Sequence, residues 1–299
     1  MVLHAPAKVN LHLDIKGLRA DGYHEILSIV QTVPLFDEVR IRSLKHSSDL
    51  RVYCNPPLHG AENIAETAAG RFRRLCAVKG GLDIRIEKRI PVGAGLGGGS
   101  SDAAAVLMGL NRMMDSPLSD RRLRTLGAGL GSDVPLFMGH SAALVSGRGE
   151  VIQPLVPRRD LVIVLVFPGI SISTTRAYAW YDAAAAATAA AAAAAALAGH
   201  GPTDKQLKEC YESESPERWV FFNSFQDVIE QRYPLIKQIV SQINACGAQH
   251  TAISGSGSSV FGVFTDARAA GEACKRMLRD GLRAWTLVPL KSEVAQIMM

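Results

Sequence analysis

Apolar and polar residues alternate in the first part of the chain as they do in a β-strand. Between Lys8 and Ile15 every second residue is apolar, and the polar set is Lys8, Asn10, His12 and Asp14. Because successive side chains of a strand point to opposite faces, this period of two separates the polar set from the apolar set. We therefore predict a strand whose polar face carries a lysine.

The remainder of the chain predicts strands and helices in mixed order. Alternation or short apolar runs predict strands over residues 38–44, 50–54, 82–90, 142–146, 151–155, 161–167, 249–254 and 259–264. Apolar residues three or four apart predict helices over residues 62–78, 100–114, 121–126, 234–246 and 267–282. Residues 183–196 are alanine except Thr188, which leaves no polar face, so we infer no function from this tract. The pattern breaks at residues 156–159, which favours two domains, residues 1–157 and 158–299.

The composition is that of a folded protein with a large core. Of 299 residues, 47% are hydrophobic and 20% are charged, which excludes global disorder. The five cysteines are widely spaced and form no C-x-x-C pair, so we expect neither a disulfide framework nor a zinc site, and a reducing, cytoplasmic compartment fits best. Because no basic segment followed by an apolar stretch begins the chain, we expect no signal peptide and no membrane span.

The net charge of +5 raises the question of a polyanionic partner. Lys and Arg are scattered, however, and their densest groups, residues 71–74 and 121–124, lie in helical patterns. We therefore expect no nucleic-acid partner, whereas a phosphorylated small molecule needs only a few of these charges. The sequence predicts no oligomeric state.

The strongest local signal is the segment Pro91–Ala105, which reads PVGAGLGGGSSDAAA. Five glycines within seven residues let the backbone approach a ligand closely and leave N–H groups free to point at it. Ser100, Ser101 and Asp102 are residue types that cap helices, and a helical pattern follows them. A glycine loop before a helix N-terminus favours phosphate, because the free N–H groups and the helix dipole both attract an anion.

Other interpretations of this glycine segment are weaker. A P-loop requires G-x-x-x-x-G-K-[ST], and the lysine is missing here. Residues 93–98 match G-x-G-x-x-G, but a dinucleotide site also requires a second parallel strand with an acidic residue, and residues 119–126 are helical in pattern instead. A plain flexible connector would not need the run of capping residues.

A lysine and an aspartate supply the groups that phosphoryl transfer needs. Lys8 lies on the first predicted strand, and Asp133 lies in a short polar turn between apolar stretches. The reaction requires a positioned hydroxyl, a carboxylate that can accept its proton, and positive charge near the transferred group. Taken alone, the two residues are also typical of an exposed strand lysine and a turn aspartate, and their spacing does not bring them together.

Three segments together resemble the superfamily of galactokinase, homoserine kinase, mevalonate kinase and phosphomevalonate kinase. They are Pro6–Leu11, Pro91–Ala105 and Ala252–Gly262, and the last two resemble the family's phosphate loop and its glycine-rich C-terminal motif. A fourth segment, Ala20–Ser28, resembles the branch that phosphorylates the 2-hydroxyl of a methylerythritol carrying cytidine diphosphate, in non-mevalonate isoprenoid (terpenoid) precursor biosynthesis. The resemblance runs from residue 5 to about residue 290, except for the alanine tract.

The resemblance implies an α+β fold of two domains with the active site in the cleft between them. The first domain would be the ATP-binding, phosphate-loop domain, with a mixed sheet, and the second would lie on the substrate side, with a ferredoxin-like arrangement. ATP would be the phosphoryl donor, and magnesium is expected with it. Asp133 and Ser101 are candidates for its ligands, but no cluster of carboxylates identifies the metal site.

The resemblance also assigns site residues position by position. Lys8 and Asp133 match the catalytic lysine and aspartate, with Asp133 as base or anchor for the attacking hydroxyl and Lys8 holding Asp133 ionised. The ATP-binding positions are Asn63, Lys88, Pro91, Val92, Gly93, Ala94, Gly95, Leu96, Gly97, Gly98, Gly99, Ser100 and Ser101. The positions that hold the cytidine end of the substrate are Asn10, Tyr23 and His24, with Tyr178 as the second stacking ring. Residues 254–259 would form a second backbone anion site, although a hairpin turn explains them too.

Three alternatives stay open on the sequence. A sister kinase would act on homoserine or mevalonate, and Tyr23 with His24 argues against it unless both only build a turn after Gly22. A non-catalytic nucleotide-binding protein of the same fold would not need Lys8 and Asp133. A polyanion-binding module would lose affinity steeply with added salt.

Overall fold

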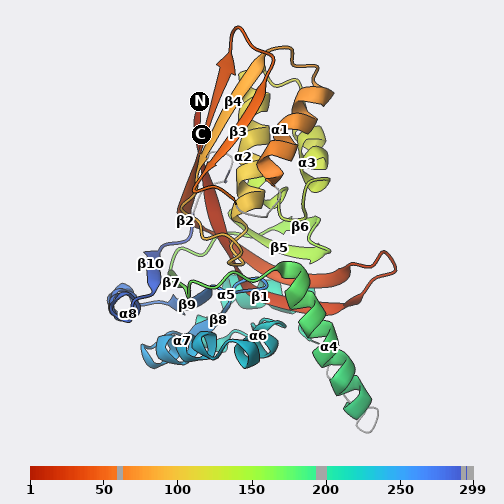
Figure 1. The fold of residues 1–299 in the computed structure, drawn as a ribbon. Helices are drawn as coiled ribbons and strands as arrows, with labels where there is room; N and C mark the ends of the chain where they lie inside the picture. The colour runs from red at the N-terminus through yellow and green to blue at the C-terminus, as the bar shows by residue number, and fades with distance from the viewer. Residues whose placement is uncertain (59–62, 193–200, 291–293, 295–299) are drawn as a thin grey trace.

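The computed structural model describes residues 1–58, 63–192, 201–290 and 294, and its strands form two sheets with helices packed against them (Figure 1). The first sheet and its helices make one half of the molecule, and the second sheet and its helices make the other half. A long hairpin of the first two strands connects the two halves.

The first sheet is mixed. Its strands are β1 (Val2–Leu18), β2 (His24–Leu44), β3 (Leu50–Asn55), β4 (Gly81–Glu87), β5 (Ala142–Gly147) and β6 (Val151–Pro154). The order is β3-β4-β2-β5-β6, with β1 also paired to β2, and only the β3–β4 pair is parallel. Helices α1 (Ile64–Leu75), α2 (Gly98–Met113) and α3 (Asp120–Ala128) cover one face of this sheet, and a 3₁₀ turn, η1 (Leu136–Met138), follows them.

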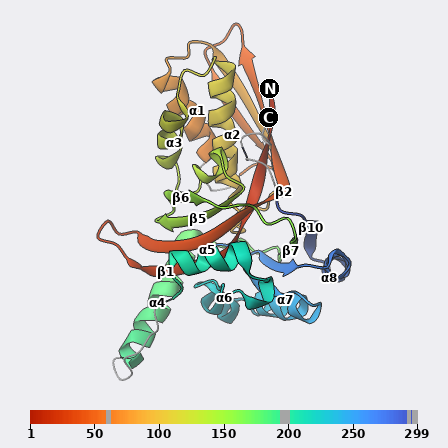
Figure 2. The ribbon, with the colours of Figure 1, turned by 180° about the vertical axis from the view of Figure 1, so that it is seen from behind.

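The second sheet is antiparallel and has the order β10-β7-β9-β8. Its strands are β7 (Val162–Phe167), β8 (His250–Ile253), β9 (Val260–Phe264) and β10 (Arg283–Leu287). Its helices are α4 (Thr174–Ala192), α6 (Gln226–Arg232), α7 (Pro234–Ala245) and α8 (Ala267–Arg279). Helix α5 (Asp204–Ser213), followed by the 3₁₀ turn η2 (Pro216–Arg218), passes in front of the β1–β2 hairpin in the view of Figure 2.

Strand β1 is buried on both faces, although its alternating sequence is typical of a strand with one solvent-exposed face. Its apolar side chains Val9 and Leu11 lie in a core shared with the second sheet. Its polar side chains are buried as well: Lys8 is 5% exposed and Asn10 6%. The lysine of the predicted polar face is therefore not a solvent-exposed strand lysine.

The predicted elements are confirmed in outline, and their ends differ from the sequence pattern in places. Helix α2 begins at Gly98, two residues earlier than predicted, and its N-cap is Gly97 in the left-handed conformation (φ 70°). Ser100, Ser101 and Asp102 therefore lie inside the helix rather than capping it. The first half of β2, strand β10 and helices α4, α5 and α6 are absent from the sequence-based prediction, and the predicted start of the first helix at residue 62 lies outside the described residues.

Segments from each half of the chain pack into the other half. Leu13 and Ile15 of β1 join the core beneath the second sheet, and Val294, near the end of the chain, is buried in the core under α1 and α2. Strands β1–β6 come from residues before 157 and β7–β10 from residues after it. We keep 1–157 and 158–299 as the proposed domains.

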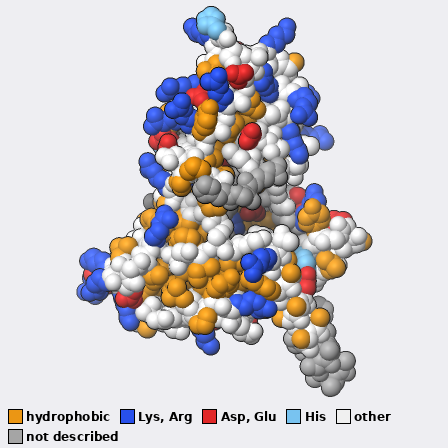
Figure 3. Space-filling model, viewed as in Figure 1, with side chains coloured by type: hydrophobic (Ala, Val, Ile, Leu, Met, Phe, Trp, Pro, Cys, Tyr) orange, Lys and Arg blue, Asp and Glu red, His pale blue; other side chains and the backbone are white. Residues whose placement is uncertain are grey.

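Lys and Arg side chains lie at both edges of the first half, interspersed with acidic and apolar side chains (Figure 3). Among the described residues, no helix combines the length and apolar character needed to cross a bilayer.

Candidate active site

Lys8 and Asp133 meet in the folded chain. The distance from Lys8 Nζ to Asp133 Oδ2 is 3.8 Å, with the lysine side chain 6% exposed and the aspartate side chain 42% exposed. Burial lowers the pKa of Lys8, and the negative charge of Asp133 opposes that shift. A buried cation thus lies beside a carboxylate that solvent, or a substrate hydroxyl, can reach.

The glycine loop turns its carbonyl groups towards the protein. The oxygens of Gly93, Ala94 and Leu96 accept hydrogen bonds from the N–H groups of Ile172, Ser259 and Lys8, in that order. Gly95 O accepts from the Ser254 hydroxyl, and Gly97 O from the N–H of Ser101. In the described part of the chain, the N–H groups of residues 95–100 have no protein acceptor. Backbone donors left over at a helix N-terminus are what a bound phosphate requires, so the loop fits an anion.

A second glycine loop, residues 254–258, holds the first in place. Gly95 has φ +75°, and a Cβ there would lie 1.9 Å from the carbonyl oxygen of Ser254, so only glycine fits at this point of contact. The N–H groups of Ser254, Gly257 and Ser259 are used in protein hydrogen bonds. We therefore interpret this second loop as a support for the phosphate loop, and its role as an anion site stays a prediction.

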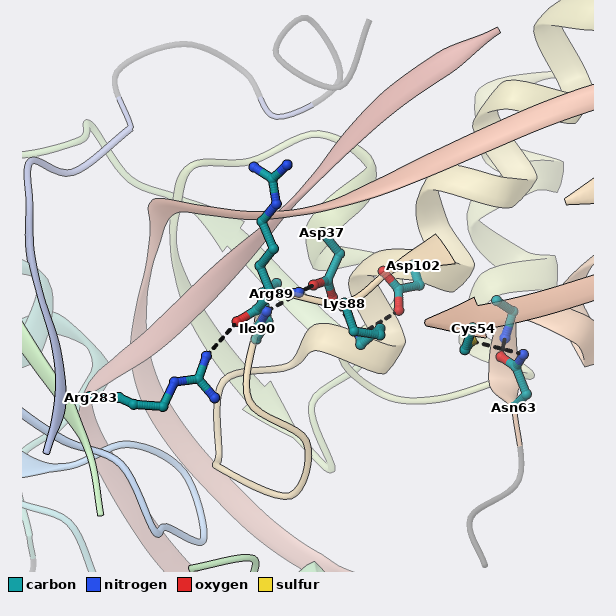
Figure 4. Close-up of polar contacts among 9 residues, drawn as sticks. Asp37, Cys54, Asn63, Lys88, Arg89, Ile90, Asp102 and Arg283 are labelled. Carbon is teal, nitrogen blue, oxygen red and sulfur yellow. Dashed lines mark hydrogen bonds and ion pairs between the residues drawn. The ribbon is translucent and has the colours of Figure 1, made fainter. Parts of the chain in front are cut away.

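Lys88 is the centre of a buried ion-pair cluster (Figure 4). Its ammonium contacts Asp37 and lies 2.6 Å from Asp102 Oδ2. Burial by itself would lower the pKa of Lys88, but the negative charges of Asp102 and Asp37 outweigh it and raise that pKa. Burial raises the pKa of Asp102 to about 7, partly offset by Lys88. The cluster lies beneath the phosphate loop, since a Cβ at Gly98 would be 3.3 Å from Lys88 Nζ.

Asp37 also fixes the backbone that leads into the phosphate loop. Its Oδ1 accepts the N–H groups of Arg89 (2.6 Å) and Ile90 (2.8 Å), while Arg283 of β10 donates to the carbonyl oxygen of Arg89 (Figure 4). Sequence reasoning missed Asp37, because a single acidic residue in a strand pattern gives no signal of what it accepts.

Asn63 acts at the start of α1. Its Oδ1 accepts the N–H of Ala65 (3.1 Å), and its Nδ2 lies 3.5 Å from Cys54 Sγ (Figure 4). The side chain is thus a helix cap in this structure, and its contact with a nucleotide stays a prediction.

The predicted substrate residues divide into two groups. His24 stacks on Tyr178 with ring centroids 4.5 Å apart and an 18° angle, and its Nε2 lies 2.8 Å from Asp182 Oδ1. Tyr23 is 54% exposed, and the Arg148 guanidinium lies 5.0 Å from its ring centroid. His24 and Tyr178 are thus brought together, with His24 covering one face of Tyr178, and their role in holding cytidine stays a prediction.

Asn10 lies apart from these rings, on the buried face of β1. Its Oδ1 accepts from Lys8 Nζ, and its Nδ2 donates to Ser28 Oγ (2.9 Å). Sequence reasoning missed Ser28 and Asp182, whose importance comes only from the side chains that they touch.

Candidate metal ligands are few. Among the described residues, no group of three or more His, Cys, Asp or Glu side chains is arranged to hold a metal ion. Ser101 is fully buried, and its hydroxyl has no hydrogen-bond partner within the described chain, so it does not reach the exposed side of the loop. Asp133 is the better candidate of the two, since it is accessible.

A phosphate loop held between two sheet-and-helix halves, beside a lysine–aspartate pair, defines a small-molecule kinase of the GHMP class. Models of the GHMP kinase N-terminal and C-terminal domains match residues 63–146 and 208–283. The chain is 40% identical to the 4-diphosphocytidyl-2-C-methyl-D-erythritol kinase of Geobacter sp. (strain M21), over 95% of each chain, and 38% identical to that of Treponema pallidum (strain Nichols), over 93% of this chain and 94% of the relative. It belongs to the 4-diphosphocytidyl-2-C-methyl-D-erythritol kinase family.

Solved structures agree with this family and extend the fold beyond it. A crystal structure of 4-(cytidine 5'-diphospho)-2C-methyl-D-erythritol kinase matches with a TM-score of 0.76 and 32% identity, over 96% of this chain and 99% of that one. The homoserine kinase of Cytophaga hutchinsonii matches with a TM-score of 0.64 and 18% identity, over 98% and 95%. The second match shows a shared fold alone.

Proposed function

We propose that this kinase transfers a phosphoryl group from ATP to the 2-hydroxyl of 4-diphosphocytidyl-2-C-methyl-D-erythritol, giving the 2-phosphate and ADP. The reaction belongs to isoprenoid precursor biosynthesis. The family relationship supports the substrate, and one observation carries the chemistry: Lys8 and Asp133 lie together beside a loop whose N–H groups have no acceptor in the described chain.

Asp133 would accept the proton of the attacking hydroxyl, because it is the accessible carboxylate of the pair. Lys8 would orient the hydroxyl and place positive charge beside Asp133, since its buried ammonium lies 3.8 Å from that carboxylate. The negative charge of the transferred group would be stabilised by backbone N–H groups of residues 95–100 and by the N-terminus of α2. The protein takes little part in the covalent chemistry and mainly positions the reactants.

Magnesium would reach the site with the nucleotide. This ion keeps several waters and binds through one or two carboxylates plus substrate phosphates, so a dedicated cluster of protein ligands is not required.

The cytidine end would be recognised at the pair of rings formed by His24 and Tyr178. A pyrimidine packs on an aromatic face, and the polar edge of a histidine can read its hydrogen-bonding pattern. Tyr23, more exposed, would close over the base. We also propose a cytoplasmic location, supported by five cysteines that are all free thiols.

The deciding experiment is ADP release from ATP and magnesium with three acceptors: the cytidylyl substrate, homoserine and mevalonate. We expect turnover with the cytidylyl compound alone. Turnover with another alcohol would keep the kinase and discard the cytidine pocket. ATP binding without turnover on any acceptor would favour a non-catalytic nucleotide-binding protein.

A further inference from the structure

The buried lysine of the catalytic pair is held by a chain of hydrogen bonds that has only one possible direction. Lys8 Nζ donates to Asn10 Oδ1 and faces Asp133, and Lys8 is 5% exposed. An ammonium withdrawn from water needs polar partners to replace its lost hydration, and these two are the ones that the described residues supply. The orientation of the Asn10 amide therefore matters for where Lys8 points.

Ser28 determines that orientation. Its hydroxyl donates to the carbonyl oxygen of His12 (2.5 Å), so its one proton is committed, and Ser28 Oγ can only accept from other groups. The neighbouring group is Asn10, whose Nδ2 donates to Ser28 Oγ at 2.9 Å. With the amide nitrogen bound to Ser28, the amide oxygen must face Lys8. Ser28 is fully buried, so no solvent replaces it.

The same asparagine ties the lysine to the phosphate loop. The backbone N–H of Asn10 donates to Ser254 Oγ (3.2 Å), and the Ser254 hydroxyl donates to Gly95 O (2.9 Å). Asn10 therefore contacts both parts of the site. Its side chain binds the catalytic lysine, and its backbone N–H is linked through Ser254 to the phosphate loop.

We propose that Ser28 is a positioning residue for phosphoryl transfer, which acts through the Asn10 amide to aim the ammonium of Lys8. The proposal rests on the proposed function for its kinetic readout. Without the Ser28 hydroxyl, the amide is free to rotate and to present its nitrogen to Lys8, which would repel the cation and leave it without an acceptor.

The test is a double-mutant cycle of Ser28→Ala and Asn10→Ala, with Ser28→Thr as the variant that keeps the hydroxyl. We expect Ser28→Ala to lower kcat roughly tenfold, the usual effect of one misdirected buried hydrogen bond, with the KM for ATP unchanged. Ser28→Thr should recover most of the loss. If Ser28 acts through Asn10, the double variant is no slower than Asn10→Ala alone. Wild-type kcat in Ser28→Ala, or a double variant slowed by the product of both effects, overturns the proposal.

A matched control removes a hydrogen bond to the same strand without touching Lys8. Ser224 Oγ accepts the N–H of Ile15 (3.0 Å), so Ser224→Ala should leave kcat unchanged. A second readout needs no substrate: a crystal structure of the full-chain Ser28→Ala variant, in which the Lys8 ammonium should leave its place between Asn10 Oδ1 and Asp133. An unchanged position of Lys8 overturns the proposal. This result does not depend on turnover, so a failure of the proposed function is recognised separately.

Discussion

Ser254 hydrogen bonds to Gly95 through its hydroxyl (2.9 Å), and the carbonyl of the same serine lies where a side chain of residue 95 would begin. One residue of the second half therefore both holds the phosphate loop and limits it to glycine. Because the contact leaves no free space, the shape of the loop depends on the packing of the two halves.

Gly95→Ala should cost more than backbone strain alone. An alanine at φ +75° pays about 1 kcal/mol for its left-handed conformation, and here its Cβ would also meet the Ser254 carbonyl. Gly169→Ala is the matched control, since Gly169 has φ +77° and nothing within 4 Å of its Cβ position. Denaturant unfolding and ATP titration should show a larger stability loss and weaker ATP binding for Gly95→Ala only. Equal behaviour of the two variants would contradict the packing argument.

Asp133→Asn should abolish turnover while ATP affinity stays nearly intact. The amide cannot accept the hydroxyl proton, but it has about the size of the carboxylate and carries no part of the phosphate loop. Steady-state kinetics and ATP titration separate the two effects. Asp160→Asn, which removes an aspartate paired with Arg158, should keep wild-type turnover. Wild-type rates in Asp133→Asn would reject the assigned role.

The buried Asp102 should make the free energy of unfolding depend on pH. Its pKa is raised from 3.8 to about 7 by burial, so the folded protein binds this proton more tightly than the unfolded chain does. The contribution of Asp102 is therefore fully present below the unfolded value and is lost as pH rises through about 7. Asp102→Asn should remove this part of the fall in the free energy of unfolding with rising pH. Urea unfolding between about pH 4 and about pH 8 measures it.

Asp160 provides a comparison of opposite sign for that measurement. Its hydrogen bond to Arg158 lowers its pKa, so its stabilisation is present at high pH and is lost as pH falls. Asp160→Asn should therefore lower stability more at high pH than at low pH.

The prediction for Asp102 has its own contradicting outcome. A pH profile of Asp102→Asn parallel to that of the wild type would show that the pKa of Asp102 is the same in the folded and unfolded states.

Tyr178→Leu should weaken binding of the cytidylyl substrate. Loss of one aromatic face costs about 1 kcal/mol, so the KM for that substrate should rise roughly fivefold, with the KM for ATP unchanged. Tyr178→Phe keeps the ring that stacks with His24 and should behave like the wild type. Equal rises in both KM values for Tyr178→Leu would indicate a general disturbance of the fold instead.

Elements with local sequence signals could be predicted before the fold was known. The alternation from residue 8 to residue 15 specified β1, and the glycine run specified a close backbone approach before a helix, because both depend on backbone geometry and side-chain period alone. Recognised motifs then indicated the kinase class, which the relatives confirm. The helix start was wrong by two residues, because the left-handed conformation of Gly97 starts the helix before the serines.

Which of these residues work together depends on contacts that exist only in the folded chain. No spacing along the chain brings Lys8 to Asp133 or Ser254 to Gly95. The first contact joins distant segments of the first half, and the second arises where the two halves pack together. The burial of Lys88 between Asp37 and Asp102, and the direction of the chain from Ser28 through Asn10 to Lys8, depend in the same way on neighbours from distant segments. The charge state, the hydrogen-bond direction and the burial of a side chain all depend on its neighbours in space, and these are set only when the chain folds.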